Sequence, residues 1–182
     1  MRKPHSILHN GKPLDEILEA HLRFVRAEEG GARADLRNAD LNRADLSSAI
    51  LSYADLQGAC LAWADLRKAK LGNADLTGAN LHGADLRNAD LTETVLAGAD
   101  LSEAQLGGIE FFRADLSGAN LRRANLRVAN FRDAKLHGAD LRGADLTTTI
   151  LRETDLSGVD LSENDLSHTL LPVNWKGPAT RG

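Results

Sequence analysis

The residues best suited to chemistry in this 182-residue chain are aspartates that recur at fixed spacings. Stacked carboxylates can bind Ca²⁺ through oxygen ligands or serve as a general acid and base in glycoside hydrolysis. One acidic set, spaced in multiples of 20, is Asp35, Asp55, Asp75, Asp115 and Asp155, and another is Asp45, Asp65 and Asp85. Arg67 and Arg87 each follow an aspartate by two residues, and no insertion sets any aspartate apart in a pocket. We therefore expect a solvated, salt-bridged surface with no metal, no cofactor and no catalytic residue.

The cysteine and the histidines form no recognisable catalytic group either. Cys60 is the single cysteine, which excludes internal disulfides and a cysteine-bound zinc, and we expect it to be inert because no histidine lies beside it. His82, His137 and His168 fall on three different faces of the repeat described below, so no His–Asp or His–Ser pair is expected. The sequence therefore predicts a protein that is not an enzyme.

A repeat of five residues must position these side chains. From Leu36 to Leu171 every fifth residue is large and apolar, giving 28 unbroken positions of which 26 are Leu and two are Phe. Ala lies two residues before this centre in 21 units, and Asp lies one residue before it in 15. Residues five apart on a helix lie about 140° apart, and on a strand they alternate between faces. The period therefore predicts a chain that turns a corner every five residues, with Ala and Leu pointing inward.

Glycine spacing sets the number of corners in one coil. Gly occurs two residues after the centre at Gly58, Gly78, Gly98, Gly118, Gly138 and Gly158, which are 20 residues or four units apart. A type II turn requires positive φ at its second central residue, and glycine adopts it readily. We infer one edge of a four-cornered coil, and 28 units then form seven coils whose hydrogen bonds run along the axis. Phe111 and Phe131 are also 20 apart, so their rings are expected to stack in adjacent layers.

The Ala-Asp/Asn-Leu-x-x units over residues 34–173 resemble the pentapeptide-repeat family. The resemblance implies an all-β solenoid, a right-handed quadrilateral parallel β-helix. We expect residues 1–33 to form an N-terminal segment with a capping helix at about 13–29, because apolar residues recur there at helical spacing before Gly30-Gly31. Residues 174–182 are expected to form a C-terminal tail. The resemblance also raises a homodimer through the C-terminal coil.

Charge and hydropathy exclude other classes. The whole chain has a formal net charge of −4, and the repeats alone carry 21 acids against 14 bases, a net of −7. Direct nucleic-acid binding is therefore not expected. No apolar run approaches the length of a membrane span, so we expect no membrane association and a cytoplasmic location.

Outward apolar side chains are the strongest indication of a binding surface. The candidate interaction residues are Ile50, Tyr53, Trp63, Phe112, Ile150, Leu170, Val173 and Trp175. We favour a non-catalytic, rigid interaction or scaffold module with an unknown protein partner. The alternative, which the family resemblance implies, is a DNA-mimicking modulator of DNA gyrase or topoisomerase of the quinolone-resistance type. Outward arginines, leucine centres and the lack of a loop disfavour that alternative.

Overall fold

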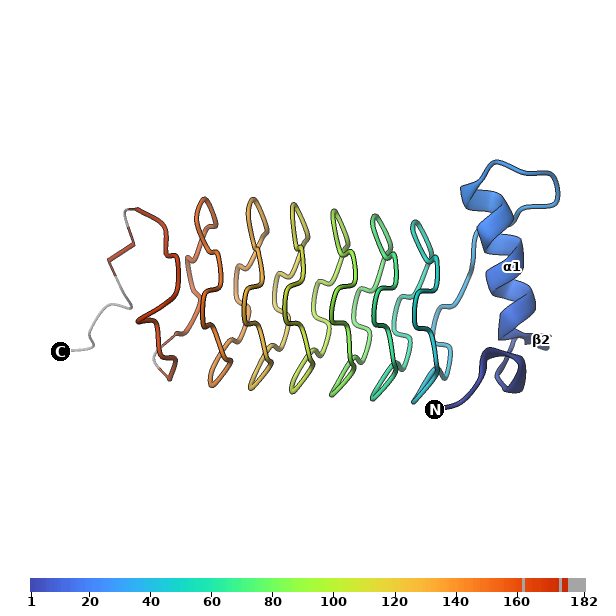
Figure 1. The fold of residues 1–182 in the computed structure, drawn as a ribbon, viewed down its shortest axis with the longest axis horizontal. Helices are drawn as coiled ribbons and strands as arrows, with labels where there is room; N and C mark the ends of the chain where they lie inside the picture. The colour runs from blue at the N-terminus through green and yellow to red at the C-terminus, as the bar shows by residue number, and fades with distance from the viewer. Residues whose placement is uncertain (162, 174, 177–182) are drawn as a thin grey trace.

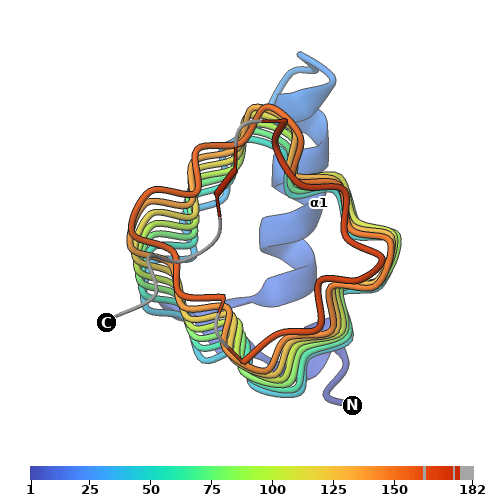
Figure 2. The same ribbon diagram turned by 90° about the vertical axis from the view of Figure 1, so that its left-hand side faces the viewer.

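The structure is a computed structural model that describes residues 1–161, 163–173 and 175–176. The repeats stack into a rod with one helix across its N-terminal end (Figure 1). Viewed along the rod, successive coils superimpose on one four-sided outline (Figure 2). The regular elements all precede the repeats: the 3-10 helix η1 (Pro4–Ser6), strands β1 (Leu8–His9) and β2 (Lys12–Pro13), and helix α1 (Leu14–Val25). Strands β1 and β2 pair antiparallel.

Backbone hydrogen bonds join each coil to the next along the rod. Parallel bridges link residues 20 apart, from Asp35 with Asp55 to Ile150 with Leu170. The amide of Leu36 donates to the carbonyl of Asp55 at 2.7 Å, and the amide of Asp55 donates to the carbonyl of Ala34 at 2.9 Å. One coil is therefore 20 residues, and the four-unit spacing read from the glycines is the true structural period.

The corners are tight turns that all share one backbone conformation. In the first, the amide of Ala39 donates to the carbonyl of Leu36 at 3.1 Å, and Asn38 between them has φ of 55°. The same position has positive φ in every unit from Asn38 to Gly158. The inference that glycines mark one special edge was therefore too narrow, because all four edges require this conformation. Even Val128, with a branched Cβ, adopts it.

The interior is filled by the repeat centres and their preceding alanines. The centres from Leu36 to Leu151 are each at most 1% exposed. The rings of Phe111 and Phe131 stack with centroids 4.7 Å apart, as their spacing predicts. Thr149 replaces an inward Ala and donates its hydroxyl to the carbonyl of Leu126 at 2.8 Å. An inward hydroxyl therefore keeps a hydrogen-bond partner inside the apolar interior.

A local hydrogen bond explains the Asp or Asn before each centre. The Oδ1 of Asp35 accepts the amide of Arg37 at 3.3 Å, and the Oδ1 of Asn80 accepts the amide of His82 at 3.0 Å. Aspartate and asparagine both carry this acceptor, so either residue can stabilise the turn. The aspartates of the acidic columns therefore have a structural role, because they accept hydrogen bonds within the turns.

The N-terminal segment packs on the first coil. Leu14 of α1 is fully buried and Ile17 and Leu18 pack against the core. The Nδ1 of the buried His21 accepts the amide of Ala34 at 3.0 Å. Helix α1 lies inside the range 13–29 expected from the sequence. None of the helices described is long and apolar enough to cross a membrane.

Arg2 joins the first coil through an isolated parallel bridge to Ala44. Its amide donates to the carbonyl of Arg43 at 2.7 Å, and its carbonyl accepts the amide of Asp45 at 2.8 Å. Arg2 therefore makes hydrogen bonds to the first coil like those that successive coils make to each other.

At the C-terminal end the ladder stays regular at Leu170. Its carbonyl accepts the amide of Leu151, and its amide donates to Thr149, both at 2.8 Å. Of the tail predicted over 174–182, residues 174 and 177–182 lie outside the described part of the chain.

Candidate functional site

The carboxylates of the first acidic column are hydrogen-bonded or ion-paired to neighbouring side chains. Arg37 donates two hydrogen bonds to the carboxylate of Asp35, at 2.8 and 2.6 Å, and lies 3.7 Å from that of Asp55. The bond from Arg37 lowers the pKa of Asp35 to about 2. Further along, Lys135 contacts Asp115 at 3.3 Å. Asp75 accepts a bond from Gln57 at 2.6 Å, and Asp155 accepts one from the Ser157 hydroxyl at 2.5 Å.

The second column is paired in the same way. Lys3 contacts Asp45 at 2.5 Å, Arg67 binds Asp65 through two bonds of 2.8 and 2.6 Å, and Arg87 binds Asp85 at 2.9 and 2.7 Å. The hydrogen bond from Arg67 lowers the pKa of Asp65. Among the described residues, no group of three or more His, Cys, Asp or Glu side chains is arranged to hold a metal ion. These columns form a salt-bridged surface.

The candidate apolar residues do not form one continuous surface. Ile50 and Ile150 share one ladder column, but Lys70, Asp90, Glu110 and Asn130 separate them. Tyr53 lies with Ile50 at the N-terminal coil and is 51% exposed. Phe112 lies alone in the middle of the rod, with the guanidinium of Arg113 4.8 Å above its ring.

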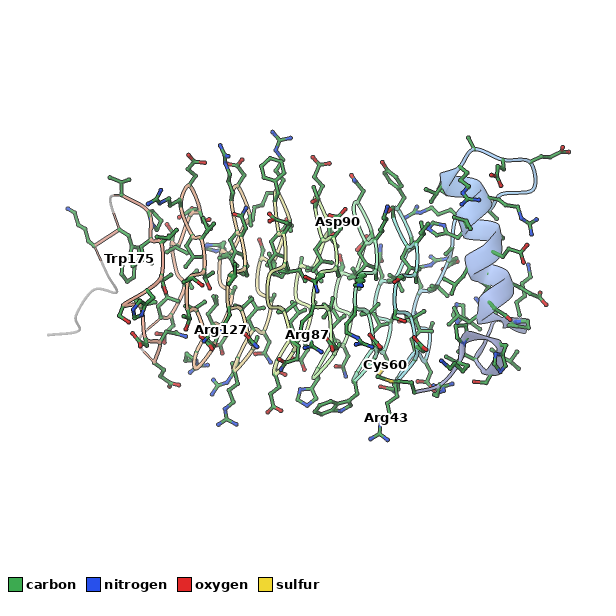
Figure 3. The ribbon with its side chains drawn as sticks, in the orientation of Figure 1. Arg43, Cys60, Arg87, Asp90, Arg127 and Trp175 are labelled. Carbon is green, nitrogen blue, oxygen red and sulfur yellow. The ribbon has the colours of Figure 1, made fainter. Side chains whose placement is uncertain are left out.

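A second apolar group lies at the C-terminal end. Ile150 and Leu170 are adjacent in the ladder, and Leu170 is 40% exposed. Val173 is 97% exposed, whereas Trp175 is partly buried against the core. Figure 3 places Trp175 at the end of the rod opposite Arg43 and Cys60. The structure therefore divides the set between the N-terminal coil, the middle of the rod and the C-terminal end, and Trp63 belongs to a separate edge.

Trp63 contacts the following coil on the edge after Leu61. Its ring and that of His82 meet edge to face with centroids 5.0 Å apart. The Nδ1 of His82 lies 2.9 Å from the hydroxyl of Ser102. The expectation that no His–Ser pair exists was therefore wrong, because residues 82 and 102 are one coil apart. The contact holds the imidazole beside Trp63, and no carboxylate in the described chain contacts that ring.

Cys60 lies on the same face, in the ladder position that elsewhere holds aspartate. Its thiol donates to the Oδ1 of Asn42 at 3.2 Å and is partly buried. A neutral residue there leaves the surface near Trp63 without the usual carboxylate.

Sequence reasoning missed a groove of about 480 Å³ between α1 and the first coil. Its charged lining residues are Lys12, Glu16, Glu19, Arg23, Arg33 and Asp35. Arg23 pairs with Glu19 at 2.7 Å, and the Nε of Arg33 donates to the carbonyl of Tyr53 at 2.5 Å. Most of these residues lie outside the repeat, so the period gave no signal for them.

Comparison with protein families finds a match to pentapeptide repeats, with eight copies. The matched segments are residues 32–67, 59–96, 74–111, 109–147 and 144–171. No curated protein matches the chain.

Several solved structures are similar. A pentapeptide-repeat protein from the thylakoid lumen of Arabidopsis thaliana is 31% identical, covering 60% of this chain and 69% of its own, with a TM-score of 0.44. HetL from the cyanobacterium Nostoc, involved in regulating heterocyst differentiation, is 36% identical over 79% of this chain and 73% of its own, with a TM-score of 0.36. QnrB1, a plasmid-mediated fluoroquinolone resistance protein, is 19% identical over 72% of this chain and 79% of its own, with a TM-score of 0.31.

Proposed function

The chain belongs to the pentapeptide-repeat family, and from this premise we propose that it is a non-catalytic interaction module acting through its outer side chains. The observation that carries the proposal is the filled interior, in which the repeat centres from Leu36 to Leu151 are at most 1% exposed. The side chains available to a ligand along the repeats are therefore the outward ones, held at fixed spacing by the interior and the ladder.

The proposed scaffold is a right-handed quadrilateral β-helix of seven coils capped by α1. The parallel bridges between residues 20 apart support the four-sided coil. Seven coils at strand spacing, about 4.8 Å each, give a rod roughly 30–35 Å long. The burial of Leu14 and the bond from Ala34 to His21 support a capping role for α1.

Carboxylate chemistry supports a role without catalysis. A general acid or base at neutral pH needs a pKa near 7. Hydrogen bonds from Arg37 and Lys3 instead lower the pKa values of Asp35 and Asp45 to about 2. Both carboxylates are therefore ionised and weakly basic at neutral pH.

We also propose that the C-terminal coil pairs two copies of the chain. The exposed apolar side chains of Leu170 and Val173 support this contact. Light scattering of the purified protein would give the mass of a dimer. A Leu170→Asp/Val173→Asp variant should be a monomer. If the wild type is also a monomer at high micromolar concentration, the pairing is refuted.

The DNA-mimic alternative rests on the rod shape and its net charge of −7 over residues 34–173. Charge varies along the axis, since residues 114–133 carry two acids and four arginines. A DNA duplex presents one negative charge per about 1.7 Å without such reversals. A gyrase supercoiling assay with micromolar purified protein tests the alternative, and neither inhibition nor protection would remove it.

The interaction proposal is tested by cross-linking the full chain to proteins of its native host. We expect a defined partner whose cross-links map to outward residues and which free protein displaces. Cross-links that are not displaced by a hundredfold excess of free protein would refute specific binding.

A further inference from the structure

We propose that one edge of the rod together with the adjoining corner at Lys68, which we call the Trp63 edge (Arg43, Cys60, Trp63, Lys68 and His82), binds an acidic segment of a partner protein. The inference deepens the proposed interaction function and rests on it. It assigns both the surface and the chemistry of the partner.

Trp63 is held flat while much of its ring remains exposed. Its backbone has φ of 59°, and 47% of the residue is exposed. A Cβ at Gly83 would collide with the indole ring, so the ring lies across the glycine backbone of the next coil. His82 contacts the ring edge to face and is itself held by Ser102. A large aromatic surface is therefore presented in one orientation, at little further cost in entropy on binding.

The indole also retains an unused donor. Its N–H makes no hydrogen bond to any residue that the structure describes. Exposed tryptophans with a free N–H suit contacts that combine apolar area with one hydrogen bond, and Trp and Arg are enriched in binding hot spots.

Two cations without ion pairs in the described chain lie on the surface around Trp63, one on the preceding coil and one at the next corner. Arg43 lies one coil earlier on the same edge, where its amide donates to Ala62 at 2.9 Å, and its side chain extends away from the rod (Figure 3). Lys68 occupies the next corner of the coil that contains Trp63. Within the described chain neither pairs with a carboxylate, whereas the nearby Arg67 pairs with Asp65. Arg43 and Lys68 are therefore available to carboxylates of a partner.

The acidic ladder is interrupted beside Trp63. On this face Cys60 and Asn80 stand between Asp40 and Asp100. The two stretches of this face around Trp63, residues 59–63 and 79–83, contain no Asp or Glu. The local charge therefore favours an acidic ligand, although the rod as a whole is acidic.

Acidic side chains further along the same face limit the length of that ligand. After residues 79–83, the next stretch of this face carries Asp100 and Glu103. A nucleic acid that tracked along this face would meet these carboxylates, whereas a short acidic peptide that ends at His82 would not. The charge pattern thus favours an acidic protein segment with an apolar residue that packs on the indole.

Tryptophan fluorescence gives a direct test. In the full chain with Trp175→Phe, Trp63 is the single tryptophan and reports binding of a synthetic peptide of sequence Glu-Glu-Pro-Phe-Glu-Glu. We expect a saturable fluorescence change that weakens several-fold between 50 and 500 mM salt, because exposed charge pairs are screened. The same peptide with Lys in place of Glu should give no saturable change.

Matched variants distinguish this edge from general charge. The double variant Arg43→Ala/Lys68→Ala should weaken binding by about tenfold. Arg123→Ala/Arg152→Ala removes two other arginines without ion pairs in the described chain and should leave the affinity unchanged. Thermal melting followed by circular dichroism checks that each variant folds.

Three results would overturn the assignment: no saturable change, equal weakening by both double variants, or tighter binding of an oligothymidine, which would make nucleic acid the ligand. Cross-linking separates this inference from the broader function. If a Trp63→Ala variant still captures the partner through another face, the Trp63 edge is refuted while the interaction function stands.

Discussion

Val128 occupies a backbone conformation that β-branched residues rarely adopt, so its replacement by glycine should stabilise the rod. Its φ is 62°, in the left-handed region where a Cβ meets the neighbouring carbonyl. The side chain is 61% exposed, so little packing is lost when it is removed. Backbone strain is therefore the main effect that the substitution relieves.

The magnitude follows from two opposing effects. The left-handed conformation costs an L-residue roughly 1–2 kcal/mol, whereas glycine costs about 0.5–1 kcal/mol through the greater freedom of the unfolded chain. We expect Val128→Gly to raise the free energy of unfolding by about 0.5–1 kcal/mol, equivalent to a rise in Tm of roughly 1–4 °C.

Thermal and urea unfolding measure this change, and Gly118→Val provides a control of opposite sign. Gly118 has φ of 67°, and a Cβ there would meet no atom within 4 Å, so its substitution tests the dihedral alone. With the same two opposing effects reversed, we expect Gly118→Val to lower the free energy of unfolding by about 0.5–1 kcal/mol. A destabilised Val128→Gly variant, or a neutral Gly118→Val variant, would refute the reasoning.

Three further predictions concern the interior and the N-terminal helix. Leu101 is fully buried, so Leu101→Ala should cost about 3–5 kcal/mol in urea unfolding, and a loss below 1 kcal/mol would contradict a filled interior. Thr149→Val removes the hydroxyl at 2.8 Å from the carbonyl of Leu126, which keeps the amide of Ala129 at 2.9 Å, so calorimetry should show a loss of about 0.5–1.5 kcal/mol. Burial lowers the pKa of His21 below its ordinary value of 6.5. As pH falls, His21 therefore binds a proton at a higher pH in the unfolded chain than in the folded one. The free energy of unfolding should decrease as pH drops through 6.5 and below, and His21→Gln should make it less dependent on pH in that range.

Much of the fold could be predicted from the sequence because the period of five places the interior residues directly. The column of glycines 20 apart also revealed the coil length. The glycines did not reveal that the other edges share this conformation, because Val128 and Trp63 have positive φ although neither residue type favours it. There the interior and the ladder override local preference.

The candidate surface was predicted less completely, because side chains meet across coils. The pair of His82 with Ser102 becomes visible only when positions are compared 20 residues apart. The contact of the Trp63 ring with the backbone of Gly83 also depends on the side-chain conformation of Trp63, which the spacing does not determine. Ile50 and Ile150 share a face but lie far apart along it, so a shared face did not make a shared surface.

Small-angle X-ray scattering of a variant lacking residues 94–113 tests the central claim, a filled rod built of stacked, equivalent 20-residue coils. The deletion removes one full turn and joins Glu93 to Ala114, which continues the repeat in register. The account predicts a folded rod whose longest dimension is shorter by about 5 Å. An unfolded variant, or a folded variant whose longest dimension is unchanged, would contradict it.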